Sequence, residues 1–154
     1  MLRIKRYLAL LLVSLVLAGC NSSSHDDDDN VKYSQNLPSS MKGYELYSWE
    51  VNDGWNFTLI TGTNRVKTYG EIYSSQENVL EENWVSLKFT DVEFLKEAMK
   101  TLPEGEKIVW CDDSFLSGEQ NDMPPVSFPD NDIIDDLVAY CSQVGISLTL
   151  ANID

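Results

Sequence analysis

Histidine is almost missing from this 154-residue sequence, and the one that is present, His25, lies in a polar stretch near the N-terminus. The chain after residue 41 therefore has no imidazole, which excludes Ser-His-Asp and Cys-His nucleophilic catalysis and histidine-based zinc sites there. Neither a Walker pattern nor an EF-hand loop occurs, so nucleotide cradling and a calcium loop are not indicated. From these absences we expect no metal, no other cofactor and no enzymatic activity.

Basic residues are also few. The sequence has 11 Lys and Arg against 25 Asp and Glu, a formal net charge of −14. Three of the bases, Arg3, Lys5 and Arg6, come before residue 20, and without them the balance is 8 − 25 = −17. This charge excludes nucleic acid as a partner and argues against docking on anionic lipid headgroups. It fits a basic protein partner or divalent cations, or only a soluble, self-repelling surface.

The N-terminus has the pattern of a secretory signal. The three bases are followed by the apolar run 7–17 and by small residues, and this run is shorter than the ~20 apolar residues that span a bilayer. The tetrapeptide Leu17-Ala18-Gly19-Cys20 resembles the lipobox of bacterial lipoproteins, and the resemblance covers residues 1–20 only. An uncleaved membrane helix and an ordinary signal cut near Ala18 are the alternatives.

The lipobox resemblance implies cleavage before Cys20 and a diacylglycerol thioether on its sulfur. Two acyl chains are enough for stable anchoring. We then expect a lipid-anchored protein of the bacterial cell membrane or outer membrane, with its domain facing the periplasm or the exterior. Residues 1–19 are the predicted signal peptide, 20–41 the lipidated N-terminus with an acidic tether, and 42–154 a single globular domain. A chain starting at Lys42 is expected to fold as well as one starting at Asn21.

Periodicity predicts the elements of the domain. Aromatic-rich segments 44–50 and 55–61 flank a turn at 51–54, where Asp53-Gly54 tolerates positive φ, so they predict a β-hairpin. Its first segment alternates poorly, which favours apolar cover on both faces. Thr68 with Glu71 and Thr90 with Glu93 have capping-box spacing. The other predicted elements are a short helix near 68–71, a loop at 76–83, a strand at 84–90, a helix at 92–102, a central strand at 107–111, a loop at 112–129, a helix from Asp130 or Asn131 to Gly145, and a strand at 146–151.

The order after residue 84 is β-α-β-α-β, which favours right-handed crossovers between parallel strands. Two crossovers that advance in the same direction place both helices on one face. We therefore predict an α+β two-layer fold, within the α/β class, with a mixed sheet of about five strands and two helices on one face.

The best candidate for a ligand site is the segment after Gly62, which combines two bases with small hydrogen-bond donors in an otherwise acidic domain. Backbone N–H groups at a turn and a helix start favour anions. A small anionic ligand is therefore one possible partner, and pairing of the bases with neighbouring acids is the alternative. The candidate residues are Thr63, Asn64, Arg65, Lys67 and Thr68.

Two further groups have a functional and a structural interpretation. Asp112 and Asp113 follow the predicted central strand, where a carboxylate pair with Glu119 and Asp122 nearby would suit glycoside hydrolysis; solvated carboxylates at a strand end are the alternative. The hairpin aromatics are either a sugar-stacking or partner-binding face or part of the core. They are Tyr44, Tyr47, Trp49, Trp55 and Phe57.

Cys111 and Cys141 remain once Cys20 is set aside. A helix that runs back from the strand ending at Cys111 carries Cys141 about 15 Å away, beyond the ~7 Å between Cα atoms that a disulfide allows. We predict two buried, reduced thiols. For the whole chain the first hypothesis is a non-enzymatic binding module. The alternatives are an inhibitor or immunity-type lipoprotein against an extracytoplasmic enzyme or toxin, and a carboxylate-dependent envelope hydrolase.

Overall fold

The predicted β-hairpin lies at the centre of the fold in the computed structural model, which describes residues 36–62, 66–73 and 78–151. Strand β1 (Tyr44–Val51) pairs antiparallel with β2 (Gly54–Thr61) along its whole length. Asn52 and Asp53 form the two-residue turn and have φ values of 48° and 66°, the left-handed conformation that this tight turn requires.

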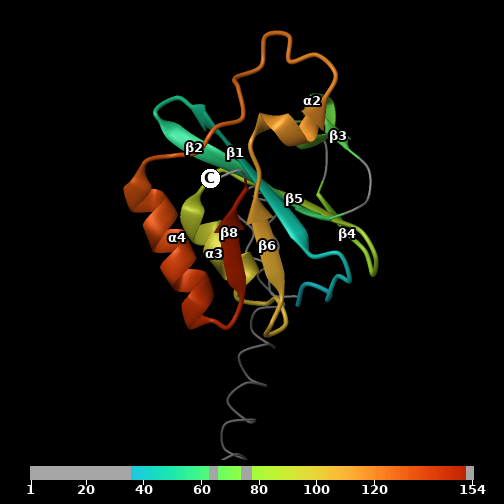
Figure 1. Ribbon diagram of the computed structural model, residues 1–154, viewed down its shortest axis with the longest axis vertical. Helices are drawn as coiled ribbons and strands as arrows, with labels where there is room; N and C mark the ends of the chain where they lie inside the picture. Colours follow the sequence, from blue (N-terminus) through green and yellow to red (C-terminus); the bar gives the residue numbers. More distant parts are fainter. Residues whose placement is uncertain (1–35, 63–65, 74–77, 152–154) are drawn as a thin grey trace, which may run out of the picture. The chain divides into compact units, whose positions relative to one another are not determined.

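A six-stranded mixed sheet extends on both sides of the hairpin (Figure 1), in the order β4-β5-β2-β1-β6-β8. The added strands are β4 (Val79–Leu80), β5 (Val85–Phe89), β6 (Lys107–Trp110) and β8 (Ser147–Leu150). Strand β6 is central, parallel to β1 on one side and to β8 on the other. Because β5 and β1 are both antiparallel to β2, strands β1, β5, β6 and β8 all point the same way. Their carboxyl ends therefore meet at one edge of the sheet.

Two helices cover one face of the sheet, as predicted. Helix α3 (Val92–Met99) connects β5 to β6 and passes over the hairpin, and α4 (Asn131–Gln143) connects β6 to β8. Leu95 and Met99 of α3 share one buried core with Leu137 of α4. Gly145 ends α4 with φ of 87°, the conformation expected after a helix end.

The other face has a smaller apolar core, so β1 is covered on both sides, as its weak alternation predicted. Tyr47 and Trp49 of β1 point into this second core. Its cover consists of β3 (Lys67–Thr68), α2 (Tyr69–Tyr73), a 3₁₀ turn (Asp113–Phe115) and β7 (Leu116–Ser117), with β3 and β7 paired in parallel. The Thr58 hydroxyl donates to the Ile72 carbonyl over 2.9 Å and ties α2 to β2. The hairpin aromatics therefore belong to the cores, Trp55 only partly buried.

The predicted loop 112–129 completes the edge of β1. Strand β6 pairs with β1 only as far as Leu46. Beyond that point Val126 forms a β-bridge with Trp49, and the Ser127 N–H donates to the Ser48 carbonyl over 2.9 Å. The Ser48 hydroxyl donates to the Ser127 carbonyl over 2.7 Å and accepts from the indole N–H of Trp110 over 2.9 Å. A buried polar residue thus links the hairpin, β6 and the loop.

Three details differ from the sequence prediction. The sheet has six strands and not five because β4 lies inside the predicted loop 76–83, and two residues are too few to show a period. The strands β3 and β7 escaped prediction for the same reason. Helix α3 is capped by Asp91 and not by Thr90: the Asp91 carboxylate accepts from the Glu93 N–H over 2.6 Å. The other predicted capping box is present, since Thr68 and Glu71 exchange bonds of 2.9 and 3.1 Å.

The described fold extends further toward the N-terminus than the predicted start at residue 42. Leu37 is 2% exposed and belongs to the core under the helices. Its N–H donates to the Thr101 hydroxyl over 3.0 Å. The Ser40 N–H donates to the Glu106 carboxylate over 3.3 Å, and the Tyr44 hydroxyl donates to the Pro38 carbonyl over 2.6 Å. Residues 37–40 are therefore part of the domain.

Cys111 and Cys141 are buried and free, as predicted. Cys111 lies in the second core, on the face that β3, α2 and β7 cover. Cys141 lies in the core under the helices. The two thiols are thus on opposite faces of the sheet. The sequence argument had separated them only by the position of Cys141 along the helix.

Candidate functional site

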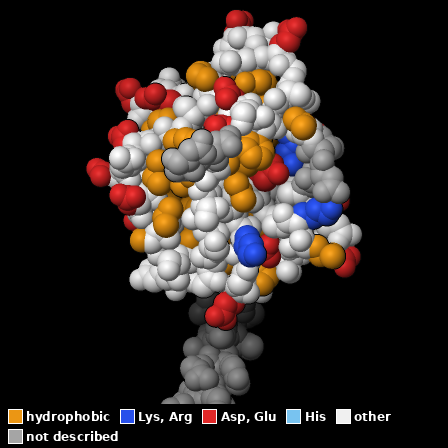
Figure 2. Space-filling model, in the orientation of Figure 1, with side chains coloured by type: hydrophobic (Ala, Val, Ile, Leu, Met, Phe, Trp, Pro, Cys, Tyr) orange, Lys and Arg blue, Asp and Glu red, His pale blue; other side chains and the backbone are white. Residues whose placement is uncertain are grey.

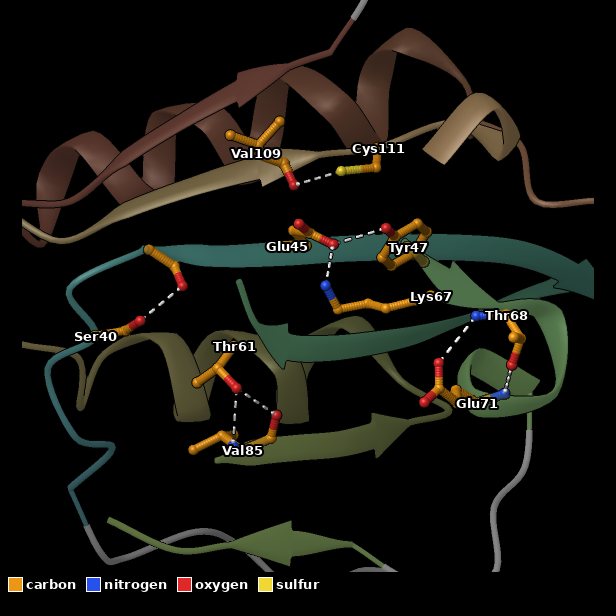
Figure 3. A network of polar contacts seen from close by, with 11 residues as sticks. Ser40, Glu45, Tyr47, Thr61, Lys67, Thr68, Glu71, Val85, Val109 and Cys111 are labelled. Atoms are coloured by element: carbon orange, nitrogen blue, oxygen red, sulfur yellow. Dashed lines mark hydrogen bonds and ion pairs between the residues drawn. The ribbon is translucent and has the colours of Figure 1, made fainter. Parts of the chain in front are cut away.

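The predicted anion-binding residues divide into a part that the structure describes and a part that it does not. Thr63, Asn64 and Arg65 lie outside the described residues. The side chain of Lys67 is 1% exposed and its Nζ lies 3.0 Å from Glu45 Oε1 (Figure 3). Thr68 caps α2 together with Glu71. In the described residues, the ammonium of Lys67 therefore faces a carboxylate of the same chain, which was the alternative interpretation of this segment.

The ion pair belongs to a cluster of buried polar side chains that joins β3 to strand β1 of the sheet. The Tyr47 hydroxyl donates to the same Glu45 oxygen over 2.8 Å, and the Cys111 thiol donates to the Val109 carbonyl over 3.5 Å. Burial, followed by the nearby charge of Glu45, raises the pKa of Cys111 to about 12. Burial also raises the pKa of Tyr47 well above its ordinary value. Both groups are neutral near pH 7, so neither supplies a thiolate or phenolate nucleophile.

Of the two carboxylates at the end of β6, Asp112 is engaged in hydrogen bonds within the chain and Asp113 is exposed to solvent. Asp112 Oδ1 accepts from the Ser114 N–H over 3.0 Å and from the Ser114 hydroxyl over 2.5 Å, and so caps the 3₁₀ turn. Asp113 is exposed in that turn. Among the described residues no group of three or more His, Cys, Asp or Glu side chains is placed to hold a metal ion.

The most distinctive surface is the edge of the sheet where strands β1, β5, β6 and β8 end. The hairpin turn, the start of α3, loop 112–129 and the start of α4 all lie at this edge (Figure 1). We call it the acidic edge, because it presents the exposed carboxylates of Glu50, Asp53, Asp91, Asp113, Glu119, Asp122, Asp130 and Asp132. The sequence contains the signal for it: residues 108–154 include nine acids and no Lys or Arg.

In the part of the chain that the structure describes, basic side chains are turned inward or lie at the opposite edge. Among the described residues, the exposed ones are Lys42, Lys100 and Lys107, which precede β1, follow α3 and start β6. Lys96 binds Asp136 of α4 over 2.7 Å and is mostly covered. Figure 2 shows acidic side chains along the upper and left margins of one face, where no Lys or Arg is visible. Exposed Glu81, Glu82 and Glu104 also lie at the opposite edge beside the exposed lysines, so that edge has mixed charge while the acidic edge is strongly negative.

An open cleft of about 400 Å³ indents the acidic edge between the hairpin turn and loop 112–129. Glu50 and Asp53 supply carboxylates on one side, and Pro124 and Pro125 supply apolar surface on the other. The loop is fixed beside the cleft because the Tyr73 hydroxyl donates to the Pro124 carbonyl and the Tyr73 ring packs edge-on against Trp49, 4.8 Å between centroids. Carboxylates beside a proline surface suit a Lys or Arg side chain. Two hollows of about 440 and 310 Å³ flank residues 38–43 at the opposite edge.

No protein family model matches this chain, and no curated protein or solved structure is significantly similar to it. None of the described helices is long and apolar enough to cross a membrane.

Proposed function

We propose that this protein is a lipid-anchored, non-enzymatic binding module that presents its acidic edge to a basic protein outside the cytoplasm. The observation that carries the proposal is the separation of charge along the strands. Exposed carboxylates gather where the strands end, and the exposed bases of the described residues lie where the strands begin. A one-signed surface of this kind steers an oppositely charged protein and fixes its orientation.

The place where the chain enters the domain supports this orientation. The N–H groups of Leu37 and Ser40 donate hydrogen bonds to Thr101 and Glu106, respectively. Both acceptors lie in the connection between α3 and the start of β6. The described chain therefore enters the domain, at residues 36–40, on the edge opposite the acidic one. The lipobox resemblance supplies the proposed anchor, which precedes this point of entry in the sequence.

The test compares two triple variants of equal charge change in a pull-down from the host envelope at low and high salt. Asp113→Asn/Glu119→Gln/Asp122→Asn removes three of the eight carboxylates of the acidic edge, and Glu81→Gln/Glu82→Gln/Glu104→Gln removes three exposed acids at the opposite edge. We expect the parent chain to retain a basic protein at low salt and release it as the salt rises, since screening weakens exposed charge pairs. The first variant should lose most of this binding and the second should keep it. Equal loss in both variants, or retention that salt does not change, contradicts the proposal.

An inhibitor or immunity function is a special case that uses the same edge. It requires that the retained protein be an enzyme or toxin and that the bound chain suppress its activity, which an activity assay of the eluted partner decides. The hydrolase alternative has less support, because Asp112 is engaged in capping. Unchanged hydrolysis of envelope polysaccharide by an Asp113→Asn variant would remove Asp113 from that mechanism as well.

A further inference from the structure

Strand β8 forms one outer edge of the six-stranded sheet and pairs only with β6 among the described residues. The hydrogen bonds between β8 and β6 show which backbone groups of β8 point outward. The N–H groups of Ser147 and Ala151 donate inward, to the carbonyls of Glu106 and Trp110. Because N–H and C=O groups alternate in direction along a strand, those of Leu148 and Leu150 point away from β6. Two consecutive outward residues offer two donors and two acceptors to an added strand.

Apart from its length of four residues, β8 has none of the usual protection against pairing in the described part of the chain. Exposed edge strands in natural proteins are commonly blunted by Lys, Pro, a bulge or short length. Residues 146–151 contain no charged residue and no Pro, and β8 pairs with β6 in unbroken register. At the other edge of the sheet, β4 is only two residues long and is followed by Glu81 and Glu82. Of the two edges described, β8 is the one open to another strand.

The charge around β8 decides which strand fits it. Lys107 lies opposite Ser147 at the start of β8, but residues 108–154 carry no base, and exposed Asp132 and Asp135 lie on α4, which packs on β8. A second copy of this chain would place like charges side by side, whereas Lys or Arg side chains of another protein would meet these carboxylates. The carboxyl end of β8 also leads directly into the acidic edge (Figure 1).

We propose that β8 is the docking site for an extended, Lys- or Arg-rich segment of the partner protein, which adds to the sheet as a seventh strand. Backbone hydrogen bonds to Leu148 and Leu150 fix the segment, and the carboxylates of α4 select its basic side chains. The inference rests on the proposed function, because it names how the basic partner is recognised.

The test uses octapeptide probes with the full chain in detergent micelles. The peptide (Lys-Val)4 has both the charge and the backbone donors of the proposed segment. The peptide (Lys-Pro)4 keeps the charge, but it lacks half of the N–H groups and resists strand pairing. The peptide (Glu-Val)4 reverses the charge. We expect (Lys-Val)4 to bind at least ten-fold more tightly than (Lys-Pro)4. It should also slow amide exchange at Leu148 and Leu150, while the inward amides of Ser147 and Ala151 change little.

Two outcomes overturn the inference and can be told apart. If both lysine peptides bind equally and no β8 amide gains protection, charge alone attracts them, so strand addition is wrong and the proposed function stands. If neither lysine peptide binds better than (Glu-Val)4, both proposals fail.

A pair of variants gives an independent check. Ser147→Lys/Thr149→Lys places edge lysines at two exposed positions of β8, where they repel a basic strand. The matched control, Asn83→Lys/Thr90→Lys, adds the same charge at exposed positions flanking β5, on the other side of the hairpin. We expect the β8 variant to lose the preference for (Lys-Val)4 over (Lys-Pro)4 and the control to keep it, with both proteins unfolding at the midpoint of the parent. A β8 variant that keeps the preference contradicts docking at this edge.

Discussion

Replacement of Leu37 by Ala tests whether the domain begins before residue 42. Leu37 is 2% exposed and packs in the core under α3 and α4, although its neighbours in sequence are polar. Truncation of a buried Leu to Ala destabilises proteins by about 2–5 kcal/mol, depending on how far the site can collapse. Residue 37 lies in a segment that enters the domain from one side and can relax, so we expect about 2–3 kcal/mol.

Thermal and denaturant unfolding, followed by the fluorescence of the four Trp residues, measures this loss. For a domain of this size, 1 kcal/mol moves the midpoint by roughly 4–8 °C, so Leu37→Ala should lower it by about 8–24 °C. Met41→Ala is the matched control in the same segment. Met41 is fully exposed, and its truncation should change stability by less than about 0.5 kcal/mol.

The reasoning would be refuted by a Leu37→Ala protein as stable as the Met41→Ala protein. Residues 36–41 would then behave as the tether that the sequence predicted. A chain that starts at Lys42 should be destabilised at least as much as the point variant, because it lacks both the Leu37 side chain and the hydrogen bond from the Leu37 N–H to Thr101.

Three further predictions concern the anchor, the ion pair and the thiols. Cys20→Ala should release the protein from the membrane or leave it unprocessed, and a variant that is cleaved normally and still partitions with detergent would contradict the lipobox interpretation. Lys67→Met alone should destabilise the domain by about 2–4 kcal/mol, because it leaves Glu45 without its cation in a mostly covered site. In denaturant titrations, the double variant Glu45→Gln/Lys67→Met should regain part of that loss. Additive losses from the two single variants would count against a coupled pair. Two thiols should react in denatured protein purified without reductant, and stability should hold up to about pH 9 and fall between pH 9 and 12. Burial raises the pKa values of Cys111 and Cys141 from 9.0 to about 12, so the native state keeps protons that the unfolded chain releases; a flat unfolding midpoint across that pH range would oppose this.

The sequence was informative wherever a pattern spans several residues. The hairpin, both long helices and the α+β class were predicted because alternation, helical spacing and turn residues agree over these segments. Two-residue strands such as β3, β4 and β7 have too few residues for a period, and β3 and β7 also depend on each other although they lie far apart in the chain. Leu37 was missed for a related reason. A single apolar residue in a polar stretch has no local signal, and only the packed core shows that it is buried.

Lys67 shows why a charge count does not describe a surface. Its sequence neighbours, a glycine turn with Arg65 and small donors, favoured an anion site, because nothing local indicated that Glu45 lies across from it. Long-range pairing of β3 with β7 over the sheet places the Lys67 side chain in the second core. Lys96 is similarly occupied by Asp136. As a result the folded domain exposes fewer bases than its composition suggests, and those that the described part exposes lie at one edge. The sequence predicted an acidic protein correctly, but the separation of charge that supports the proposed function depends on which lysines the fold turns inward.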